Sequence, residues 1–552
     1  MNSLYIVLIV FILYYLGYRF YANLIVKLWN VNPEEITPAH RFNDGIDYVP
    51  AKHWTVLFGH HFASIAGAGP IIGPVIAAAL WGWLPALIWL VLGSIFLGGV
   101  HDFSALIASL KHEGKSISYV AESTLGYKSK MIFATFLWLS LILVVAVFAA
   151  VAGKTLAAKP EVVLPTFGIV VVALIVGLMM YKFKVNQLTA TLLGIVLLFI
   201  LIIAGYYYPI KVKPFHIGSL LISPKNFWIT ILLIYAYFAS IIPVNILLQP
   251  RDYLSTFVLF FGLFLGYLGL VVSHPQIQAP AFVTWNSSQG WLWPMLCVII
   301  ACGAISGFHS LVASGTTAKQ LSSMKNAKRI GYGAMLLESV LAVLALLSVV
   351  AGLKWSGRGS LVYPQLLAEK GWIITFGEGF GQIVLPFIKV GLGSLIAITI
   401  LKTFIMTTLD SATRITRYLT EELFVDGLNL RFLKNRYLQT FIIVAFAGWL
   451  AYGKYQVIWP VFGAANQLVA ALVLIIVTAY LFSQNRPKRY TLIPGIFMLM
   501  TTIVALGYLM GSFYRKGLYL LFSIDCLLLV LAFVIAYEVF RYLTKKELLK
   551  NV

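Results

Sequence analysis

Residues 62–74 read "FASIAGAGPIIGP" and lie within an otherwise apolar segment that covers residues 54–81. Glycine and proline make up five of the eight residues from Gly67 to Pro74. Proline removes a backbone donor and kinks a helix, and glycine weakens one. In lipid, a helix can break only where its freed peptide groups are buried or face a water-filled cavity. This stretch therefore predicts a helix that is unwound between about Ala66 and Pro70, at a binding site. A kink that serves helix packing alone is the other interpretation.

The composition indicates a membrane protein. Of 552 residues, 61% are hydrophobic and 11% are charged, and the mean hydropathy is +0.91. Soluble domains carry about 25% charged residues. The first apolar segment has no basic region before it and no small-residue cleavage site, so we expect a retained span and not a signal peptide. The sequence thus predicts an all-α polytopic membrane protein.

Apolar runs of about 20 residues, long enough to cross a bilayer, recur along the whole chain and predict about fifteen spans. The expected spans are residues 3–26, 54–81, 83–110, 131–153, 163–181, 187–209, 227–249, 254–273, 292–318, 330–352, 383–412, 438–453, 457–482, 490–513 and 517–541. No soluble domain separates them.

The net charge of +21 orients the chain in the membrane. When loops are assigned alternately to the two sides, most Lys and Arg residues fall on one side, as the positive-inside rule describes. The N-terminus is then outside and the C-terminus inside. No basic patch with an aromatic platform is present, so nucleic acid is not an expected partner. The lipid bilayer is an expected partner. The sequence predicts no particular oligomeric state.

A short repeat suggests internal symmetry. Phe62-Ala63-Ser64-Ile65 is followed by Pro74, and residues 238–241 repeat the same four letters with Pro250 at the same spacing. The two copies lie on the second and seventh expected spans, which enter from opposite sides. We therefore expect a five-plus-five inverted repeat, in which substrate binds near the midplane at interrupted helices. Residues 227–249, with Pro243, offer weaker grounds for a second interruption. The expected divisions are 1–53, an extra helix and loop; 54–226, repeat 1; 227–412, repeat 2; and 413–552, accessory spans.

The expected break suits an anion, because freed N–H groups and the N-terminus of a half-helix favour negative charge. A small carboxylate is therefore the expected substrate. Pyruvate needs little more than these donors, whereas a peptide also needs an acceptor for its α-amino group. The candidate substrate-binding residues are Ala66, Gly67, Ala68, Gly69, Pro70, Asn245 and Lys402.

Four histidines and one carboxylate share a depth of about 10–15 Å from the inner boundary, at about 1.5 Å per helical residue. They are His60, His61, His101, Asp102 and His309. A proton relay is one interpretation, because ionisable groups inside a span are costly and functional by default. A metal or haem site and merely hydrogen-bonded histidines are the alternatives. The spacings of these residues match no metal-binding motif, and neither do those of Cys297, Cys302 and Cys526. No metal or other cofactor is therefore expected.

Two further groups of polar residues lie near the ends of spans. Asp410 and Arg414 have the spacing of a helix-end salt bridge, and gating of the inner mouth is their functional interpretation. Arg251 and Asp252 are expected to anchor a turn between the seventh and eighth spans. Neither Walker A nor G-x-S-x-G nor H-E-x-x-H is present, so ATP-driven transport and an enzyme are not expected.

Four stretches resemble the carbon starvation protein A family: residues 58–103, "LLQPRDYL" (247–254), "ACGAISGFHSLVASGTTAKQL" (301–321) and "TTLDSATRITRYL" (407–419). The resemblance implies a carrier of the bacterial inner membrane. It also implies membership of the amino acid–polyamine–organocation superfamily, with the leucine-transporter-type fold. Family members are associated with uptake of peptides and of pyruvate during nutrient limitation.

In the resembled fold, hydroxyl groups of the third helix of the second repeat help to build a sodium site. Ser306 and Ser310 would lie on one face of that helix, with Gly303 and Gly307 allowing close approach. The predicted function is ion-coupled symport, with protons favoured over sodium. The alternatives are a sodium-coupled carrier of another organic solute and a membrane-embedded metalloenzyme with histidine ligands.

Overall fold

The computed structural model describes residues 1–357, 361–453 and 455–550, and nearly all regular structure there is helical. The first part of the chain forms α1 (Ser3–Leu16), η1 (Gly17–Tyr21), α2 (Ala22–Leu28), α3 (Pro38–Arg41), α4 (Trp54–Ile65), α5 (Gly69–Trp81), α6 (Trp83–Gly93), η2 (Ser94–Gly98), α7 (Gly99–Lys111), α8 (Ile117–Leu125), α9 (Tyr127–Ala158), η3 (Pro160–Val162), α10 (Val163–Gly177), η4 (Leu178–Lys182) and α11 (Gln187–Tyr207).

The second part forms α12 (Pro224–Ile241), α13 (Leu248–Ser273), α14 (Leu292–Ile299), α15 (Gly307–Val312), η5 (Ala313–Thr317), η6 (Met324–Asn326), η7 (Arg329–Gly333), α16 (Ala334–Gly352), α17 (Tyr363–Lys370), α18 (Trp372–Ile383), α19 (Val390–Thr420), η8 (Glu421–Gly427), η9 (Arg431–Lys434), α20 (Arg436–Tyr452), α21 (Tyr455–Ser483), α22 (Arg489–Arg515) and α23 (Tyr519–Lys550). The described residues also include two short antiparallel hairpins: β1 (Phe215–Ile217) with β2 (Leu220–Ile222), and β3 (Asn286–Ser287) with β4 (Gly290–Trp291).

Within the described residues, 11 helices are long and apolar enough to cross a membrane, or 12 if the bent pair α4–α5 is one span. The predicted count of about fifteen is not confirmed. One expected span, 438–453, corresponds to α20, which has only 17 residues. Another, 292–318, is divided among α14, α15 and η5. The mostly helical, multi-pass character of the chain is nevertheless clear.

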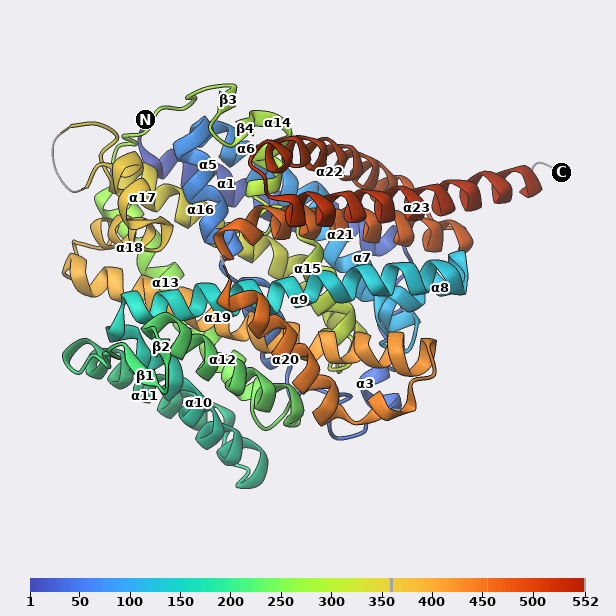
Figure 1. Cartoon of the computed structure of the whole chain (residues 1–552), viewed down its shortest axis with the longest axis horizontal. Coiled ribbons are helices and arrows are strands. Elements are labelled where there is room, and N and C mark those ends of the chain that lie inside the picture. Colours follow the sequence, from blue (N-terminus) through green and yellow to red (C-terminus); the bar gives the residue numbers. More distant parts are fainter. Residues whose placement is uncertain (358–360, 454, 551–552) are drawn as a thin grey trace.

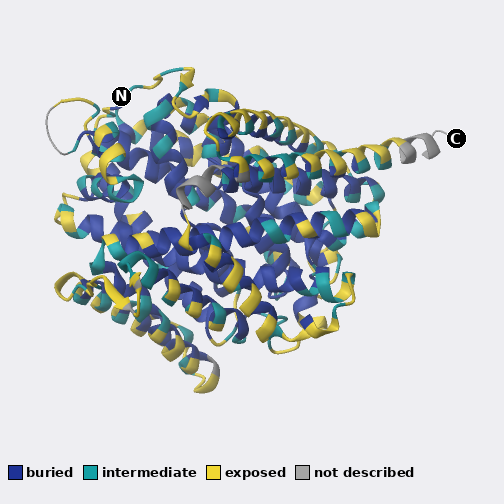
Figure 2. Ribbon diagram, viewed as in Figure 1, coloured by how far each residue is buried: buried dark blue, intermediate teal, exposed yellow. Residues whose placement is uncertain are grey.

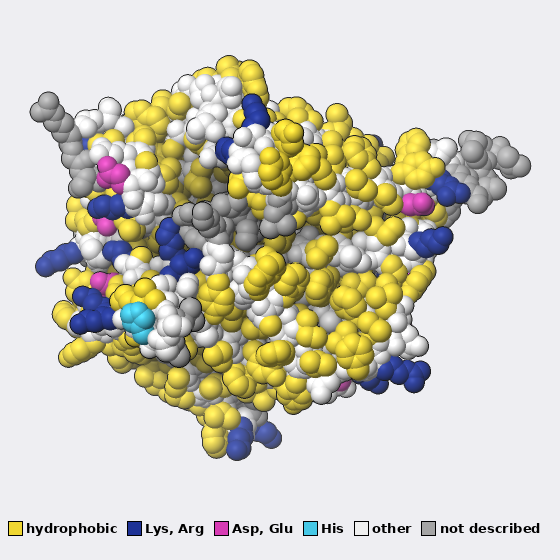
Figure 3. Space-filling model, viewed as in Figure 1, with side chains coloured by type: hydrophobic (Ala, Val, Ile, Leu, Met, Phe, Trp, Pro, Cys, Tyr) yellow, Lys and Arg dark blue, Asp and Glu magenta, His cyan; other side chains and the backbone are white. Residues whose placement is uncertain are grey.

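The long helices α9, α19 and α21 run through the middle of the molecule (Figure 1). Each of α19 and α21 packs against α9, and α22 and α23 cover α21 along one edge. Figure 2 shows the buried residues gathered in this centre, with exposed residues on the outer helices. Hydrophobic side chains cover most of the face drawn in Figure 3, as expected for helices that face lipid.

The predicted interruption of the second span is confirmed. α4 ends at Ile65, α5 begins at Gly69, and the two are bent by 42°. The glycines are needed for close approach: a Cβ at Gly67 would lie 2.8 Å from Thr408 Oγ1, and one at Gly69 would lie 2.4 Å from Cys302 Sγ. The break is therefore packed tightly against α19 and the segment that follows α14.

A second interruption lies in residues 300–306, between α14 and α15. A Cβ at Gly73 would lie 2.6 Å from the Ile299 carbonyl oxygen, so α5 packs directly against this second break. The weaker expectation of a break near Pro243 agrees with a loss of helical structure there, although the chain continues into a separate helix. α12 ends at Ile241, and residues 242–247 connect it to the separate helix α13.

Candidate functional site

A cavity of about 220 Å³ lies beside both interruptions. Gly69 at the start of α5 forms part of its wall, and no side chain caps the N-terminus of that helix. Polar wall atoms come from Gln289, Cys302 and Asn466, and Phe462 adds an aromatic surface. No Asp, Glu, Lys, Arg or His is among the described residues that line it. The cavity therefore offers hydrogen bonds and the end of a helix, but no full charge.

Asn466 of α21 holds the second interruption in place. Its Oδ1 accepts the backbone N–H of Phe308 at 2.8 Å, and its Nδ2 lies 3.0 Å from Ser306 Oγ. Asn466 thus satisfies a donor at the start of α15 that would otherwise be free. Sequence reasoning missed this residue. The available signal was a pair of amides, Asn466 and Gln467, in the apolar span 457–482.

The predicted sodium ligands are not arranged as expected. Ser306 has extended backbone angles and precedes α15, so Ser306 and Ser310 do not share a helical face. The reason is the break itself, which ends the helix before Ser306. The hydroxyl of Ser306 contacts Asn466, and that of Ser310 donates to the Gly307 carbonyl at 2.6 Å.

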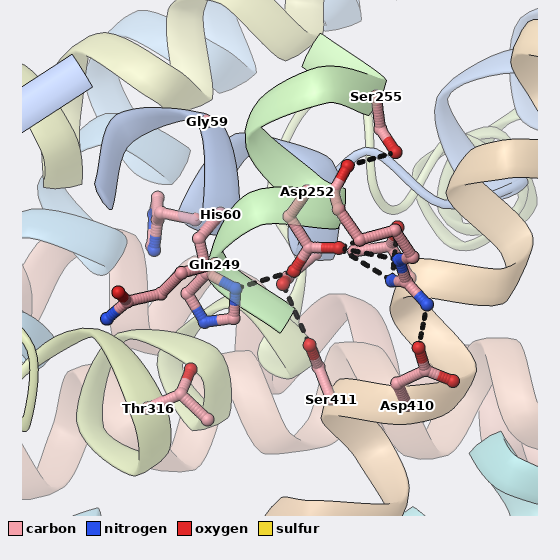
Figure 4. A network of polar contacts seen from close by, with 12 residues as sticks. Gly59, His60, Gln249, Asp252, Ser255, Thr316, Asp410 and Ser411 are labelled. Carbon is pink, nitrogen blue, oxygen red and sulfur yellow. Dashed lines mark hydrogen bonds and ion pairs between the residues drawn. The ribbon is translucent and has the colours of Figure 1, made fainter. Parts of the chain in front are cut away.

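A buried group of charges, which we call the Arg251 cluster, joins four helices: its members are His60 of α4, Tyr235 of α12, Arg251 and Asp252 of α13, and Asp410 of α19. His60 Nδ1 lies 2.7 Å from Asp252 Oδ2, and Figure 4 shows these side chains pointing toward one another. Arg251 Nη2 lies 2.6 Å from Asp252 Oδ1. The same guanidinium contacts Asp410, which also accepts the Tyr235 hydroxyl at 2.7 Å.

The expectation that Arg251 and Asp252 anchor a turn is wrong. They lie inside α13 and are almost completely buried, at 1% and 0% exposure. The helix starts at Leu248, earlier than its hydropathy suggests, because a Pro can occupy an early helical position and buried partners balance the charges. The two carboxylates and one guanidinium leave one formal negative charge beside the His60 ring.

A second buried group, which we call the Asp102 cluster, contains His101 and Asp102 of α7, His309 of α15 and Glu338 of α16. Asp102 lies 2.7 Å from His101 Nδ1 and 2.9 Å from His309 Nδ1. Glu338 lies 3.1 Å from the other ring nitrogen of His309. Sequence reasoning missed Glu338, although a carboxylate within the apolar span 330–352 was a signal of function.

The expected layer of histidines is therefore divided. His101, Asp102 and His309 are in direct contact, whereas His60 belongs to the Arg251 cluster. His61 is buried and its Nδ1 pairs with the Thr317 hydroxyl at 2.8 Å. No group of three or more His, Cys, Asp or Glu side chains placed to hold a metal ion occurs in the part of the chain that the structure describes.

A third group, which we call the Asp47 latch, joins the loop before α4 to α19. Asp47 lies 2.7 Å from Arg414, 3.0 Å from Arg417 and 2.7 Å from the Tyr418 hydroxyl. Arg414 also donates to the Ala239 carbonyl at 2.7 Å and to that of Ile242, at the end of α12. Burial alone would raise the pKa of Asp47, but Arg417 and Arg414 lower it well below its usual value.

Asp410 and Arg414, expected as a pair, therefore have different partners. Asp410 contacts Arg251, and Arg414 contacts Asp47. The loop before α4, which the sequence did not single out, supplies the carboxylate that Arg414 needs.

The remaining candidates lie apart from the cavity wall. Lys402 is fully buried on α19, where its Nζ donates to the Ala152 carbonyl of α9 at 2.6 Å. Asn245 lies in the connection between α12 and α13 and lines a different pocket, with Lys182. Of the substrate candidates, only Gly69 lines the cavity, while Ala66 and Ala68 are buried in the break.

Solved structures share this architecture. The manganese transporter of Eremococcus coleocola, in an H236A mutant, matches with a TM-score of 0.50 and 11% identity over 90% of this chain and 97% of its own. MhsT in complex with L-phenylalanine matches with a TM-score of 0.50 and 13% identity over 88% of this chain and 99% of its own. The fold is thus of the leucine-transporter type, and the chain is a multi-pass membrane protein.

The family follows from sequence. The model of the carbon starvation protein CstA family matches residues 2–355 and 360–505, so the chain belongs to that family. The pyruvate/proton symporter BtsT of Escherichia coli K12 is 32% identical over 92% of this chain and 81% of its own length. The peptide transporter CstA of Bacillus subtilis 168 is 33% identical over 92% of this chain and 89% of its own length.

Proposed function

We propose that this protein is a secondary active transporter that imports a small carboxylate by proton-coupled symport, under carbon or nutrient limitation. Its relatives include a pyruvate/proton symporter and peptide transporters. The observation that carries the proposal is the cavity at the uncapped start of α5, beside two interrupted helices. The driving force is an ion gradient and not ATP, and the protein is a carrier and not an enzyme.

The cavity favours pyruvate over a peptide. A carboxylate is stabilised by backbone N–H groups and by the positive end of a helix. Gln289 and the amide of Asn466 add neutral hydrogen-bonding groups. A peptide would also bring an α-ammonium group, and the described wall residues include no carboxylate to receive it. Burying an unpaired ammonium costs several kcal/mol, so a monocarboxylate suits this wall better.

Protons suit the buried clusters better than sodium. Each cluster combines carboxylates with histidine, the side chain whose ordinary pKa is near neutrality. Ser306 and Ser310 do not share a helical face, so their hydroxyl groups do not form the pair of ligands expected for a sodium ion. A proton on the His60–Asp252 pair would change the charge of a contact between α4 and α13. Coupling would then act on the half-helix that leads to the cavity.

The finer topology is part of the same proposal. Residues 54–226 and 227–412 form the two inverted repeats, with 1–53 and 413–552 as additions. The N-terminus lies outside and the C-terminus inside the bacterial inner membrane, on the positive-inside rule. The Asp47 latch then lies at the inner mouth, where it joins the loop before α4 to α12 and α19.

Asn466→Asp tests the substrate class, because it adds a negative charge to the cavity while keeping the oxygen that accepts the Phe308 N–H. Binding of radiolabelled pyruvate by the purified protein should weaken at least tenfold. Asn32→Asp, in an exposed loop, should leave binding unchanged. Equal pyruvate binding by both variants, or dipeptide binding in place of pyruvate binding by the unmodified protein, would contradict the assignment.

A further inference from the structure

A groove of about 700 Å³ lies between the first span and helices α4, α13 and α16, well away from the candidate site. Aromatic and aliphatic side chains dominate its wall, and several, including Phe11, Tyr15 and Phe260, are exposed on the surface of the bundle. Because these residues belong to membrane-spanning helices, the groove opens toward lipid. Its wall residues are Phe11, Tyr14, Tyr15, Tyr18, Trp54, Thr55, Phe58, Tyr253, Thr256, Phe257, Phe260, Arg329, Gly333, Leu336, Leu337 and Val340.

One end of this groove carries basic side chains. Arg329 belongs to its wall and lies over the Trp54 ring, 5.1 Å from the ring centroid. Lys328 lies beside the wall: its Nζ is 4.2 Å from the ring centroid of Tyr18 and donates to Asn23 Oδ1 at 2.7 Å, and Arg19 and Arg329 are close enough to repel its charge. None of these three cations takes part in the ion pairs found among residues 1–357, 361–453 and 455–550. Three neighbouring cations without a carboxylate form an anion-binding surface.

We propose that this groove binds an anionic phospholipid, with an acyl chain along the aromatic wall and the phosphate at Arg329 and Lys328. Basic pockets between membrane helices bind anionic headgroups, and Arg presents a planar fork that matches a phosphate. The charge pattern selects this occupant over a neutral lipid, since a neutral headgroup would leave three cations uncompensated.

Occupancy would affect α4, the half-helix that ends at the interruption. Trp54 and Phe58 of α4 form one side of the groove, and Tyr253 and Thr256 of α13 form another. Thr256 Oγ1 lies 3.0 Å from the Gly59 carbonyl oxygen and 2.7 Å from that of Asp252 in its own helix, so its hydroxyl is shared between the two helices at the groove wall. A lipid between these walls would strengthen the packing of α4 on α13.

Brominated lipids test the proposal, because they quench the fluorescence of nearby tryptophan. The full-length protein is reconstituted in phosphatidylcholine nanodiscs and titrated with brominated phosphatidylglycerol or brominated phosphatidylcholine. We expect saturable quenching by the anionic lipid only, and loss of that component in Trp54→Phe. Arg329→Gln should weaken the affinity of the protein for the anionic lipid about fivefold, as expected for the loss of one cation near a headgroup. The matched control is Lys325→Gln, an exposed cation one turn away that pairs with Glu34 at 2.8 Å.

Equal quenching by the two lipids, or an unchanged affinity in Arg329→Gln, would overturn the proposal. If Arg329→Gln disturbs folding, native mass spectrometry of Lys328→Gln provides the second test. Lys328→Gln should retain less phosphatidylglycerol than Lys325→Gln does. Equal retention by the two variants would count against the site.

Discussion

At the scale of single residues, the molecule is defined by charges that are buried but paired. Arg251, Asp252 and Asp410 are at most 1% exposed, and each has an opposite charge in contact. Such pairs add little net stability, but removing one partner costs about 3–5 kcal/mol, because it leaves a buried charge uncompensated. The intact cluster is therefore a requirement for the packing of the four helices that meet there.

The first prediction concerns His60 and Asp252. His60→Gln keeps a hydrogen-bonding side chain but removes the proton site, so uphill accumulation of substrate driven by a pH gradient should fall more than tenfold. Exchange of labelled for unlabelled substrate, which needs no net proton movement, should persist. Both are measured in proteoliposomes, with Glu369→Gln, an exposed carboxylate on α17, as the control. Full accumulation by His60→Gln would contradict a coupling role. So would a loss of exchange as large as the loss of accumulation.

At the same scale, the sequence identified several of these residues but not their partners. His101, Asp102 and His309 were grouped correctly because helical rise places them at one depth. Depth carries no information about which faces meet, so the separation of His60 from them, and its pairing with Asp252, could not be predicted. Asp252 itself was misread because the Gln-Pro-Arg-Asp stretch has the composition of a turn.

At the scale of elements, the two interruptions are the central feature. The first was predictable because Gly and Pro act locally on the helix that contains them. The second, at residues 300–306, has one glycine, Gly303, in a longer apolar run, and its geometry depends on Asn466 from another helix. Such tertiary capping leaves little signal in the local sequence.

The second prediction tests the contact between the interruptions. Gly69→Ala places a Cβ 2.4 Å from Cys302 Sγ, and should reduce substrate uptake strongly without unfolding the protein. The double variant Gly69→Ala/Cys302→Gly removes the obstructing side chain and should recover most of the lost uptake. Gly511→Ala, where the space around the new Cβ is open, should behave as wild type. Normal uptake by Gly69→Ala would show that this close approach is unimportant.

The third prediction concerns the Asp47 latch. Because the pKa of Asp47 is lowered in the folded protein, its contribution is present above its unfolded value of about 3.9 and is lost only as pH falls below that value. Asp47→Asn should therefore destabilise the protein equally at pH 5.5 and pH 8, by about 1–3 kcal/mol for a partly exposed partner of two arginines.

Thermal unfolding at the two pH values measures this effect, with Asp426→Asn at the exposed end of η8 as the control. A destabilisation that disappears at pH 5.5 would mean that Asp47 titrates in the range of the transport reaction. In that case the latch, and not the Arg251 cluster, would be a candidate for proton coupling.

At the scale of the whole molecule, composition and hydropathy were sufficient to predict a polytopic helical bundle, and the family motifs to predict its fold class. The predicted count of about fifteen spans is not confirmed, since apolar runs such as 292–318 include interrupted segments that hydropathy cannot distinguish from continuous helices. The accessory helices α22 and α23 pack on α21, and α22 contributes Leu509 to the cavity wall. The fold thus places its charges, cavity and breaks within the central helices.

The most direct measurement is uptake of labelled pyruvate into proteoliposomes that contain the purified protein. With an inwardly directed proton gradient and no sodium, pyruvate should accumulate above its external concentration, and dissipating the gradient with a protonophore should abolish accumulation. An inward sodium gradient at equal pH should drive none. Uptake that follows sodium, or that is insensitive to both gradients, would contradict proton-coupled symport.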